Sequence, residues 1–317
     1  MEKVFLTENI HPDAVAFLQE NFEVVQGTST ESSEIIRQAQ GCAAILIRSA
    51  KITAEIMDAI PTLKVVAKHG MGVDNIAVEH ATEKGILVVN APYSNLNAVA
   101  EHIVMLLLAL SKRTVRMDKL TRAGGFKERN TYKTIELRGA TVGIIGLGKI
   151  SRLVVKKLSG FEMNILASDP YVKQGDVGDL PVTMVPSEEV YAKSDFVIVH
   201  TSLFPSTFHL VGAEQFRAMK PTAFIINAAR GPVIDEAAMI EALQSGEIAG
   251  AGLDVFEQEP PAEDNPLFAM DNVILSPHNA ALSDGALRAM AMDSAQGITE
   301  YLTGKPVTYP VNQEVLK

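Results

Sequence analysis

Three polar side chains of different chemistry stand directly after apolar runs in the second half of the sequence: Arg230, Glu259 and His278. We interpret these runs as parallel strands, whose carboxyl ends meet at one edge of a sheet, where ligands bind. An arginine can bind a carboxylate through two hydrogen bonds and polarise a neighbouring keto oxygen. An imidazole, with an ordinary pKa of about 6.5, can give that oxygen a proton and take it back. Glu259 beside the ring would favour its charged form and fix its tautomer.

Taken together, these residues predict an acid/base pair with a substrate anchor, which suits the interconversion of a 2-hydroxy acid and a 2-keto acid. Each residue alone has a simpler explanation as part of a turn or a solvated loop. His278 follows Ser-Pro, Glu259 precedes two prolines and Arg230 precedes a glycine. Their conjunction after successive strands is what indicates a catalytic site.

A glycine-rich turn of the form Gly-x-Gly-x-x-Ser predicts the cofactor site. It follows the apolar run 142–145, precedes a helix expected over 152–158, and reads Gly146-Leu147-Gly148-Lys149-Ile150-Ser151. Gly146 permits the tight turn, Gly148 lets the backbone approach a pyrophosphate, and the helix N-terminus offers N–H groups to that anion. Ser151 departs from the usual third glycine or alanine, and on this motif alone a purely structural turn remains an alternative.

Asp169 strengthens the prediction of a dinucleotide site. It ends the next apolar run, 23 residues after Gly146. A carboxylate there can accept hydrogen bonds from the adenosine ribose hydroxyls. It would also repel a 2′-phosphate, and the turn 170–173 contains no arginine. We therefore expect NAD rather than NADP, the alternative being that Asp169 is a solvated loop residue.

The elements that must position these residues read as an α/β protein, because short Val/Ile/Leu-rich runs alternate with amphipathic helical stretches. A first series of strands is expected at 4–6, 22–25, 43–47, 65–67 and 86–89. A second series is expected at 142–145, 164–167, 196–199, 223–226, 252–254 and 273–275. A long helix over about 99–120 would connect the two series, and a last helix is expected over about 284–302.

Several segments resemble the D-isomer-specific 2-hydroxyacid dehydrogenase family, which includes D-lactate, hydroxypyruvate and 3-phosphoglycerate dehydrogenases. The most specific stretches are 219–236 and 252–260, which surround Arg230 and Glu259. In the first half, Gly72-Val73-Asp74-Asn75-Ile76, Asn90-Ala91-Pro92 and Val99-Ala100-Glu101-His102 match as well. The resemblance covers nearly the whole chain.

The resemblance implies two doubly wound parallel-sheet domains: a Rossmann NAD-binding domain over 99–286, and a smaller, flavodoxin-like substrate-binding domain built from 1–98 plus 287–317. It implies that the catalytic set is Arg230, Glu259 and His278. It also implies a homodimer built through the nucleotide-binding domain, with the 99–120 helix as a contact.

The same resemblance assigns further contacts around the substrate and the cofactor. The backbone of one loop would present N–H groups to the substrate carboxylate: His69, Gly70, Met71 and Gly72. Besides the glycine-rich turn and Asp169, residues that would contact the cofactor are Thr201, Thr207, Ala228 and Asp254, the last beside the nicotinamide carboxamide. Departures from the family pattern occur at Ser151, at Ser202 and Phe204, and at 279–281 after the histidine.

Two basic residues bear on the substrate. Ile47-Arg48-Ser49 resembles the strand end that phosphoglycerate dehydrogenases use near the substrate phosphate, and Lys68 would add a second cation. A partly desolvated phosphate needs such compensation. We therefore favour 3-phosphoglycerate, with glyoxylate, hydroxypyruvate or D-lactate as alternatives. Arg48 as a structural ion-pair partner is an equally good explanation.

Two other functions remain to be weighed within this resemblance. Formate dehydrogenases pair the histidine with a glutamine, so the carboxylate of Glu259 argues against that activity. The corepressors of the family use the fold as a non-catalytic NAD(H)-sensing scaffold, and the intact triad permits that function too. Turnover would discriminate between an enzyme and a scaffold.

Composition bounds the remaining possibilities. A formal net charge of −10 with no Lys/Arg-rich stretch disfavours nucleic-acid binding. The single cysteine, Cys42, excludes an intrachain disulfide and lies beside an apolar run, as a buried residue would. We see no signal peptide, no apolar run long enough to span a bilayer and no metal motif, and expect a soluble, cytoplasmic protein. Because the chain ends at Lys317, we expect no appended regulatory domain.

Overall fold

The computed structural model describes residues 1–317, which fold into two compact units. The discontinuous unit is made of Met1–Asn95 and Ala281–Lys317, and the central unit of Leu96–Ala280. These boundaries differ by a few residues from the predicted ones, 1–98 plus 287–317 for one unit and 99–286 for the other. The predicted boundaries cut into two helices, α5 (Leu96–Ser111) and α11 (Asp284–Leu302). Each helix packs as one rigid element and belongs to a single unit.

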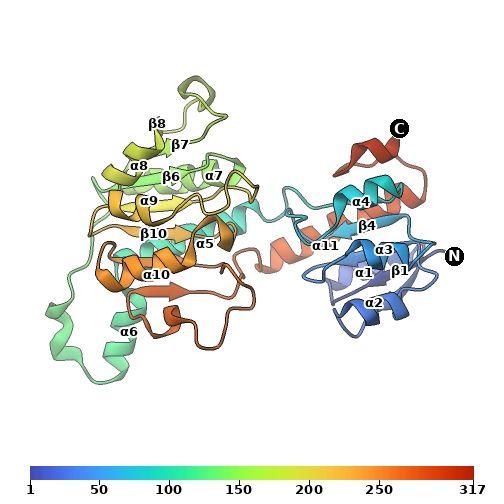
Figure 1. The fold of residues 1–317 in the computed structure, drawn as a ribbon, viewed down its shortest axis with the longest axis horizontal. Coiled ribbons are helices and arrows are strands. Elements are labelled where there is room, and N and C mark those ends of the chain that lie inside the picture. The colour runs from blue at the N-terminus through green and yellow to red at the C-terminus, as the bar shows by residue number, and fades with distance from the viewer. The chain divides into compact units, whose positions relative to one another are not determined.

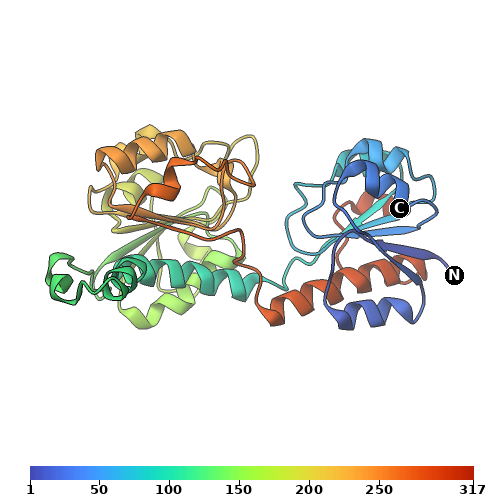
Figure 2. The same ribbon diagram turned by 90° about the horizontal axis from the view of Figure 1, so that it is seen from below.

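The discontinuous unit contains a five-stranded, all-parallel sheet in the order β2-β1-β3-β4-β5. The strands are β1 (Lys3–Leu6), β2 (Glu23–Gln26), β3 (Ala44–Ile47), β4 (Val65–Lys68) and β5 (Leu87–Val89). Successive residues of a strand point to opposite faces of the sheet, and the central strands are buried along almost their whole length. Both faces of the sheet are therefore apolar. Helices α1 (Pro12–Gln19) and α11 cover one face, and α2 (Ser32–Gln38), α3 (Ala54–Asp58) and α4 (Val78–Glu83) cover the other (Figure 2).

The central unit contains a seven-stranded parallel sheet in the order β12-β11-β10-β9-β6-β7-β8. The strands are β6 (Thr141–Ile145), β7 (Asn164–Ser168), β8 (Thr183–Met184), β9 (Phe196–Val199), β10 (Phe224–Asn227), β11 (Gly250–Leu253) and β12 (Val273–Leu275). The strand order reverses beside β6, which pairs with both β7 and β9. Such a switch point is where open α/β sheets bind ligands.

Helices cover both faces of this second sheet as well (Figure 1). Helices α8 (Ser187–Lys193), α9 (Ala213–Ala218) and α10 (Glu236–Ser245) bury apolar side chains against one face. Helices α5 and α7 (Lys149–Leu158) pack against each other on the opposite side. The predicted α/β class and the two parallel sheets are therefore confirmed, with strand orders of the Rossmann and flavodoxin-like types.

Two details of the prediction were wrong. The second sheet has a seventh strand, β8, which is only two residues long and lacks an apolar run by which it could be recognised. The helix expected over 99–120 is broken: α5 ends at Ser111, and α6 (Thr114–Arg122) starts after Arg113, whose φ of 51° is left-handed. The break redirects the chain away from the sheet. Neither α6 nor the 3-10 helix at Phe126–Thr131 contains a buried residue, and together they project from the unit (Figure 2).

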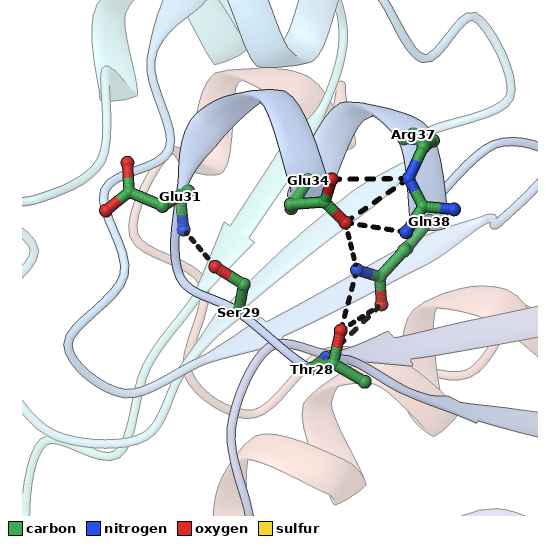
Figure 3. A network of polar contacts seen from close by, with 6 residues as sticks. All are labelled: Thr28, Ser29, Glu31, Glu34, Arg37 and Gln38. Carbon is green, nitrogen blue, oxygen red and sulfur yellow. Dashed lines mark hydrogen bonds and ion pairs between the residues drawn. The ribbon is translucent and has the colours of Figure 1, made fainter.

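A polar network on the surface ties α2 to the loop that precedes it (Figure 3). Arg37 Nη2 lies 2.6 Å from Glu34 Oε2, and Gln38 bridges the same carboxylate to Thr28. The hydrogen bonds from Arg37 and Gln38 lower the pKa of Glu34. Such exposed pairs contribute little to stability, so we assign this network a local structural role only.

The fold also bears on the cysteine and on the length of the helices. Cys42 is buried and unpaired, and burial raises the pKa of its thiol. None of the helices is long and apolar enough to cross a membrane.

Candidate active site

The closest contact between candidate catalytic residues joins Glu259 and His278. Glu259 follows β11 and His278 follows β12, and Glu259 Oε2 lies 2.7 Å from His278 Nδ1. The second carboxylate oxygen, Oε1, accepts the Phe256 N–H at 3.1 Å, which orients the group. With Nδ1 donating to the carboxylate, Nε2 is the ring nitrogen left to exchange a proton with a substrate. The arrangement is that of a general acid/base with an orienting carboxylate.

The carboxyl group of Glu259 is electrostatically suited to this task. Burial by itself would raise its pKa, but the hydrogen bond and charge of His278, the Phe256 N–H and the charge of Arg230 outweigh it. The pKa of Glu259 is therefore lowered, and the group is ionised near neutral pH. A carboxylate held beside the ring stabilises the imidazolium that forms when the ring takes up a proton.

Arg230 lies close enough for its charge to act on both Glu259 and His200. The turn after β10 positions it: Asn227 Nδ2 donates to the Arg230 carbonyl at 3.0 Å, and Asn227 Oδ1 accepts the Ala229 N–H at 3.0 Å. Gly231 is required beside it, because a Cβ there would lie 1.7 Å from the Phe256 carbonyl oxygen. The structure thus brings the three predicted side chains into one region of the central unit.

The backbone of His278 is strained and must be held in place. Its φ is 50°, in the left-handed region, which costs a non-glycine residue about 1–3 kcal/mol. The fully buried Asp254 supplies the hold: its Oδ1 accepts the Asn279 N–H and its Oδ2 the Ala280 N–H, both at 2.9 Å. The His278 N–H donates to the Asp254 carbonyl at 2.8 Å. Asp254 therefore holds the loop of His278 in place. Its contact with a nicotinamide carboxamide stays a prediction.

The glycine-rich turn fits a dinucleotide. Gly146 has a φ of 89°, and a Cβ on it would lie 2.7 Å from the His200 carbonyl oxygen. A Cβ on Gly148 would meet nothing within 4 Å, so the space that a pyrophosphate would occupy is open. Gly148 is the N-cap of α7 and supplies no side-chain hydrogen bond, and the first N–H groups of a helix have no partner within the helix itself, so this helix start suits an anion. The contacts of Lys149 and Ile150 with the cofactor stay predictions.

Buried polar atoms around this turn lack partners within the protein. They are Ser151 Oγ, His200 Nδ1 and Thr201 Oγ1. Burial, followed by the charge of Arg230, lowers the pKa of His200 to about 4, so its ring is neutral. Ser151, which stands where a glycine or alanine is usual, is fully buried in α7. Unsatisfied polar groups of this kind are expected where a bound ligand would complete the hydrogen bonding.

Asp169 lies where the sequence predicted it, at the end of β7. Its Oδ2 accepts the Leu147 N–H and its Oδ1 the Tyr171 N–H, both at 2.8 Å. The carboxylate is thereby fixed beside the glycine-rich turn, and each oxygen keeps a lone pair for a ribose hydroxyl.

The other two assigned cofactor residues have structural roles here. Thr207 Oγ1 accepts the Phe204 N–H at 2.8 Å and donates to the Ser202 carbonyl at 2.7 Å, so it shapes its own loop. Ala228 is buried in the turn that carries Arg230. Their contacts with the cofactor stay predictions.

The substrate-loop residues lie in the discontinuous unit, after β4. The His69 N–H donates to the Ile47 carbonyl and the Gly70 N–H to the Lys68 carbonyl, so those two groups already have acceptors. Contact of the Met71 and Gly72 N–H groups with a substrate carboxylate stays a prediction. Burial, followed by the charges of Arg48 and Lys68, lowers the pKa of His69 to about 4, so this ring is neutral. Its Nε2 lies 3.2 Å from the Leu287 carbonyl, to which the N–H donates.

Glu8, which sequence reasoning missed, holds the loop that carries Arg48. Its carboxylate accepts the backbone N–H groups of Arg48, Ser49 and Ala50 and the Ser49 hydroxyl. The Lys68 ammonium donates to the Arg48 carbonyl and, at 3.0 Å, to Asn75 Oδ1. Glu8 follows β1, so the rule that polar residues past strand ends form sites applies to it as well.

The hydrogen bonds to Glu8 predict a pH dependence of stability. Burial alone would raise its pKa, but the bonds from Ser49, Arg48 and Thr7 lower it from 4.5 to about 2. The ionised group therefore stabilises the fold fully above about pH 4.5, and this contribution is lost as the pH falls through 2. Urea unfolding between about pH 5 and 2, which spans the two pKa values, should show a smaller loss of stability for Glu8→Gln than for the unmodified protein. The control is Glu31→Gln, an exposed residue, and equal slopes in both variants would contradict the assignment.

Comparison with known proteins decides the family. Residues 104–280 match the family model described as D-isomer specific 2-hydroxyacid dehydrogenase, NAD binding domain. The chain belongs to this family. The match to an NAD-binding domain supports the nicotinamide cofactor that the sequence predicted.

Relatives carry two kinds of name. D-3-phosphoglycerate dehydrogenase of Archaeoglobus fulgidus is 40% identical over 312 residues, which is 98% of this chain and 59% of that protein. This chain thus spans about three-fifths of that relative. Glyoxylate reductase of Thermofilum pendens is 40% identical over 329 residues, covering 99% of this chain and 96% of that protein.

Solved structures agree with the fold over the whole chain. An NADPH-dependent glyoxylate/hydroxypyruvate reductase from Sinorhizobium meliloti, in complex with NADP and malonate, has a TM-score of 0.88 at 30% identity and covers 99% of this chain and 97% of that one. D-lactate dehydrogenase from Escherichia coli has a TM-score of 0.85 at 28% identity, with 98% and 100% coverage. The comparisons leave the substrate open.

Proposed function

We propose that this protein transfers a hydride between nicotinamide and C2 of a D-2-hydroxy acid or its 2-keto partner, using Arg230, Glu259 and His278. The observation that carries the proposal is the 2.7 Å contact between Glu259 Oε2 and His278 Nδ1, within reach of the charge of Arg230. That geometry provides a proton donor, an orienting carboxylate and a cation in one region, which is what carbonyl reduction requires.

Each side chain has a defined task in the proposed reaction. The nicotinamide, when bound, supplies or accepts the hydride. In the direction of reduction, His278 Nε2–H donates a proton to the keto oxygen as the C2–H bond forms, and in oxidation the ring takes the proton back. Glu259 stays ionised and keeps Nδ1 protonated. Arg230 binds the substrate carboxylate and polarises the C2–O bond.

Loss of the imidazole tests the catalytic assignment. Turnover is measured with NADH and a panel of 2-keto acids by the loss of NADH absorbance. His278→Ala should lower kcat by about 10²–10⁴-fold, the size of a lost general acid/base. The dissociation constant for NADH should barely change. Equal loss of NADH binding would make His278 a structural residue. Tight NADH binding by the unmodified protein without turnover of any keto acid would instead favour the corepressor-like scaffold.

The proposal includes a preference for NAD over NADP. Asp169 supports it, since its fixed carboxylate would repel a 2′-phosphate. Asp169→Ala should raise kcat/KM with NADPH relative to NADH by about tenfold or more, since like-charge juxtaposition costs more than about 1.4 kcal/mol. Asp179→Ala, an exposed aspartate of the same unit, is the control. An unchanged cofactor ratio in Asp169→Ala would exclude this role.

For the substrate we propose a phosphorylated three-carbon acid of the 3-phosphoglycerate type. Arg48 and Lys68 support this choice, because the Lys68 ammonium donates to the Arg48 carbonyl and the charges of both residues act on His69 of the predicted substrate loop. The 40% identity to proteins named D-3-phosphoglycerate dehydrogenase also supports it.

A second candidate, glyoxylate or hydroxypyruvate, is favoured by Glu8. This carboxylate occupies the backbone N–H groups of Arg48, Ser49 and Ala50 and places a negative charge there. A dianionic phosphate would meet that charge, whereas a small monoanion needs fewer cations. Proteins named glyoxylate reductase match this chain over nearly their full length. A D-lactate-type substrate has only the family likeness in its favour.

The charge of Arg48 distinguishes the two candidates. If the substrate is phosphorylated, Arg48→Gln should lower kcat/KM for 3-phosphohydroxypyruvate by about 10–100-fold more than for hydroxypyruvate, because a charge-assisted contact contributes about 1.5–3 kcal/mol. Lys51→Gln, an exposed cation three positions along, is the matched control. Equal losses for both keto acids would support the unphosphorylated substrate.

We also propose that the protein forms a homodimer through the central unit. Helix α6 and the 3-10 helix after it have no buried residue, and Val115 and Phe126 on them are 42% and 64% exposed. A projecting arm with exposed apolar side chains is what a second copy would cover. Light scattering should give the mass of two chains for the unmodified protein and of one chain for Val115→Asp/Phe126→Asp. Tyr171→Asp, 92% exposed elsewhere in the unit, should remain dimeric. A monomeric unmodified protein would refute the proposal.

A further inference from the structure

A chain of three polar side chains runs through the central unit to the loop that carries His278. It begins at His102 in α5, passes through Ser276 directly after β12, and ends at Asp254 directly after β11. His102 Nε2 lies 3.0 Å from Ser276 Oγ and 3.4 Å from Asp254 Oδ1, and Ser276 Oγ lies 2.6 Å from Asp254 Oδ1. His102 belongs to the motif Val99-Ala100-Glu101-His102 that resembles the family, and it is not one of the three side chains of the proposed catalytic set.

The direction of the hydrogen bonds follows from the donors available. The Ser276 hydroxyl has one proton, and its shortest contact is the one to the Asp254 carboxylate, which can only accept when ionised. Ser276 Oγ therefore accepts from His102, whose Nε2 must carry a proton. His102 is thus the first donor of a chain that ends on a buried carboxylate, and it also approaches that carboxylate directly.

Asp254 passes this orientation on to His278. Its two carboxylate oxygens accept the N–H groups of Asn279 and Ala280, and its carbonyl accepts the N–H of His278. The three hydrogen bonds enclose the left-handed residue His278 on both sides. Any rotation of the Asp254 side chain would release this loop, and the imidazole would then lose its fixed direction.

Close packing keeps His102 within reach of the loop. Helix α5 approaches β11 at Gly252, where a Cβ would lie 3.1 Å from Leu110 Cδ1 and 3.3 Å from Leu106 Cβ. Ile103, next to His102, is fully buried, and the His102 side chain is only 14% exposed. The helix therefore presents the imidazole to the two strand ends with little freedom to move.

We propose that His102 is a positioning residue for catalysis: through Ser276 and Asp254 it holds the loop of His278 in the orientation that proton transfer needs. The inference rests on the proposed role of His278 and extends it to a residue that touches neither substrate nor cofactor. Misplacement of a catalytic group by about 1 Å can lower a rate by about 10²-fold. The effect should therefore fall on kcat rather than on binding.

The test compares two substitutions at His102 with one at Ser276. His102→Leu removes the donor and should lower kcat by about 10–100-fold, while KM and the NADH dissociation constant change little. His102→Gln places an amide N–H where the Nε2–H lies and should recover most of the loss. Ser276→Ala breaks the chain without altering α5 and should resemble His102→Leu. The solvent deuterium isotope effect on kcat should rise in His102→Leu and Ser276→Ala, because proton transfer becomes more limiting.

A matched control separates positioning from general stability. His80→Leu removes a comparable histidine–carboxylate pair, with Asp58 at 3.0 Å, in the other unit and should leave kcat unchanged. The inference is wrong if His102→Leu and Ser276→Ala keep the unmodified kcat while His278→Ala does not. It is also wrong if His102→Leu and His102→Gln lose activity equally and only in proportion to a fall in the thermal midpoint. If His278→Ala itself retains full activity, the proposed function fails instead.

Discussion

The site depends on one buried carboxylate. Asp254 has no exposed surface, and leaving a charge unpaired there would be costly. The cost is offset by hydrogen bonds from Ser276, Asn279 and Ala280, so the charge and the loop stabilise each other. The left-handed backbone of His278 is tolerated only because these bonds over-determine it. The contact between His278 and Glu259 follows from that geometry.

The sheet topology explains why these groups meet at all. Strands β10, β11 and β12 are neighbours, all parallel, and their carboxyl ends carry Arg230, Glu259 and His278 on the loops that follow. On the other side of the switch point, β6 leads into the glycine-rich turn and β7 ends at Asp169. The proposed catalytic residues and the predicted cofactor residues therefore share one edge of a single sheet, with an apolar core behind them.

In the discontinuous unit the proposed substrate residues stand in a cluster of opposite charges. Glu8, Arg48 and Lys68 form one connected cluster. The Glu8 carboxylate accepts three backbone N–H groups, and the Lys68 ammonium donates to the Arg48 carbonyl. The neutral His69 beside them adds no charge. If the cluster binds the substrate as proposed, the positive charge that Glu8 leaves uncompensated would decide between a phosphate and a smaller anion.

The amino-acid sequence by itself determined the α/β class and the position of eleven of the twelve strands, because the apolar period is a local signal. It also predicted the three side chains of the proposed catalytic set, because each stands shortly after an apolar run. It did not reveal that the helix expected over 99–120 is broken at Arg113. The apolar period continues past this residue, and its left-handed φ is set by the tertiary packing. Nor did it reveal β8, which is short and at an edge. The roles of Glu8, His102 and Ser276 were decided only by the tertiary structure. Their partners lie far away in the sequence, and a hydrogen bond between distant residues leaves no periodic trace along the chain.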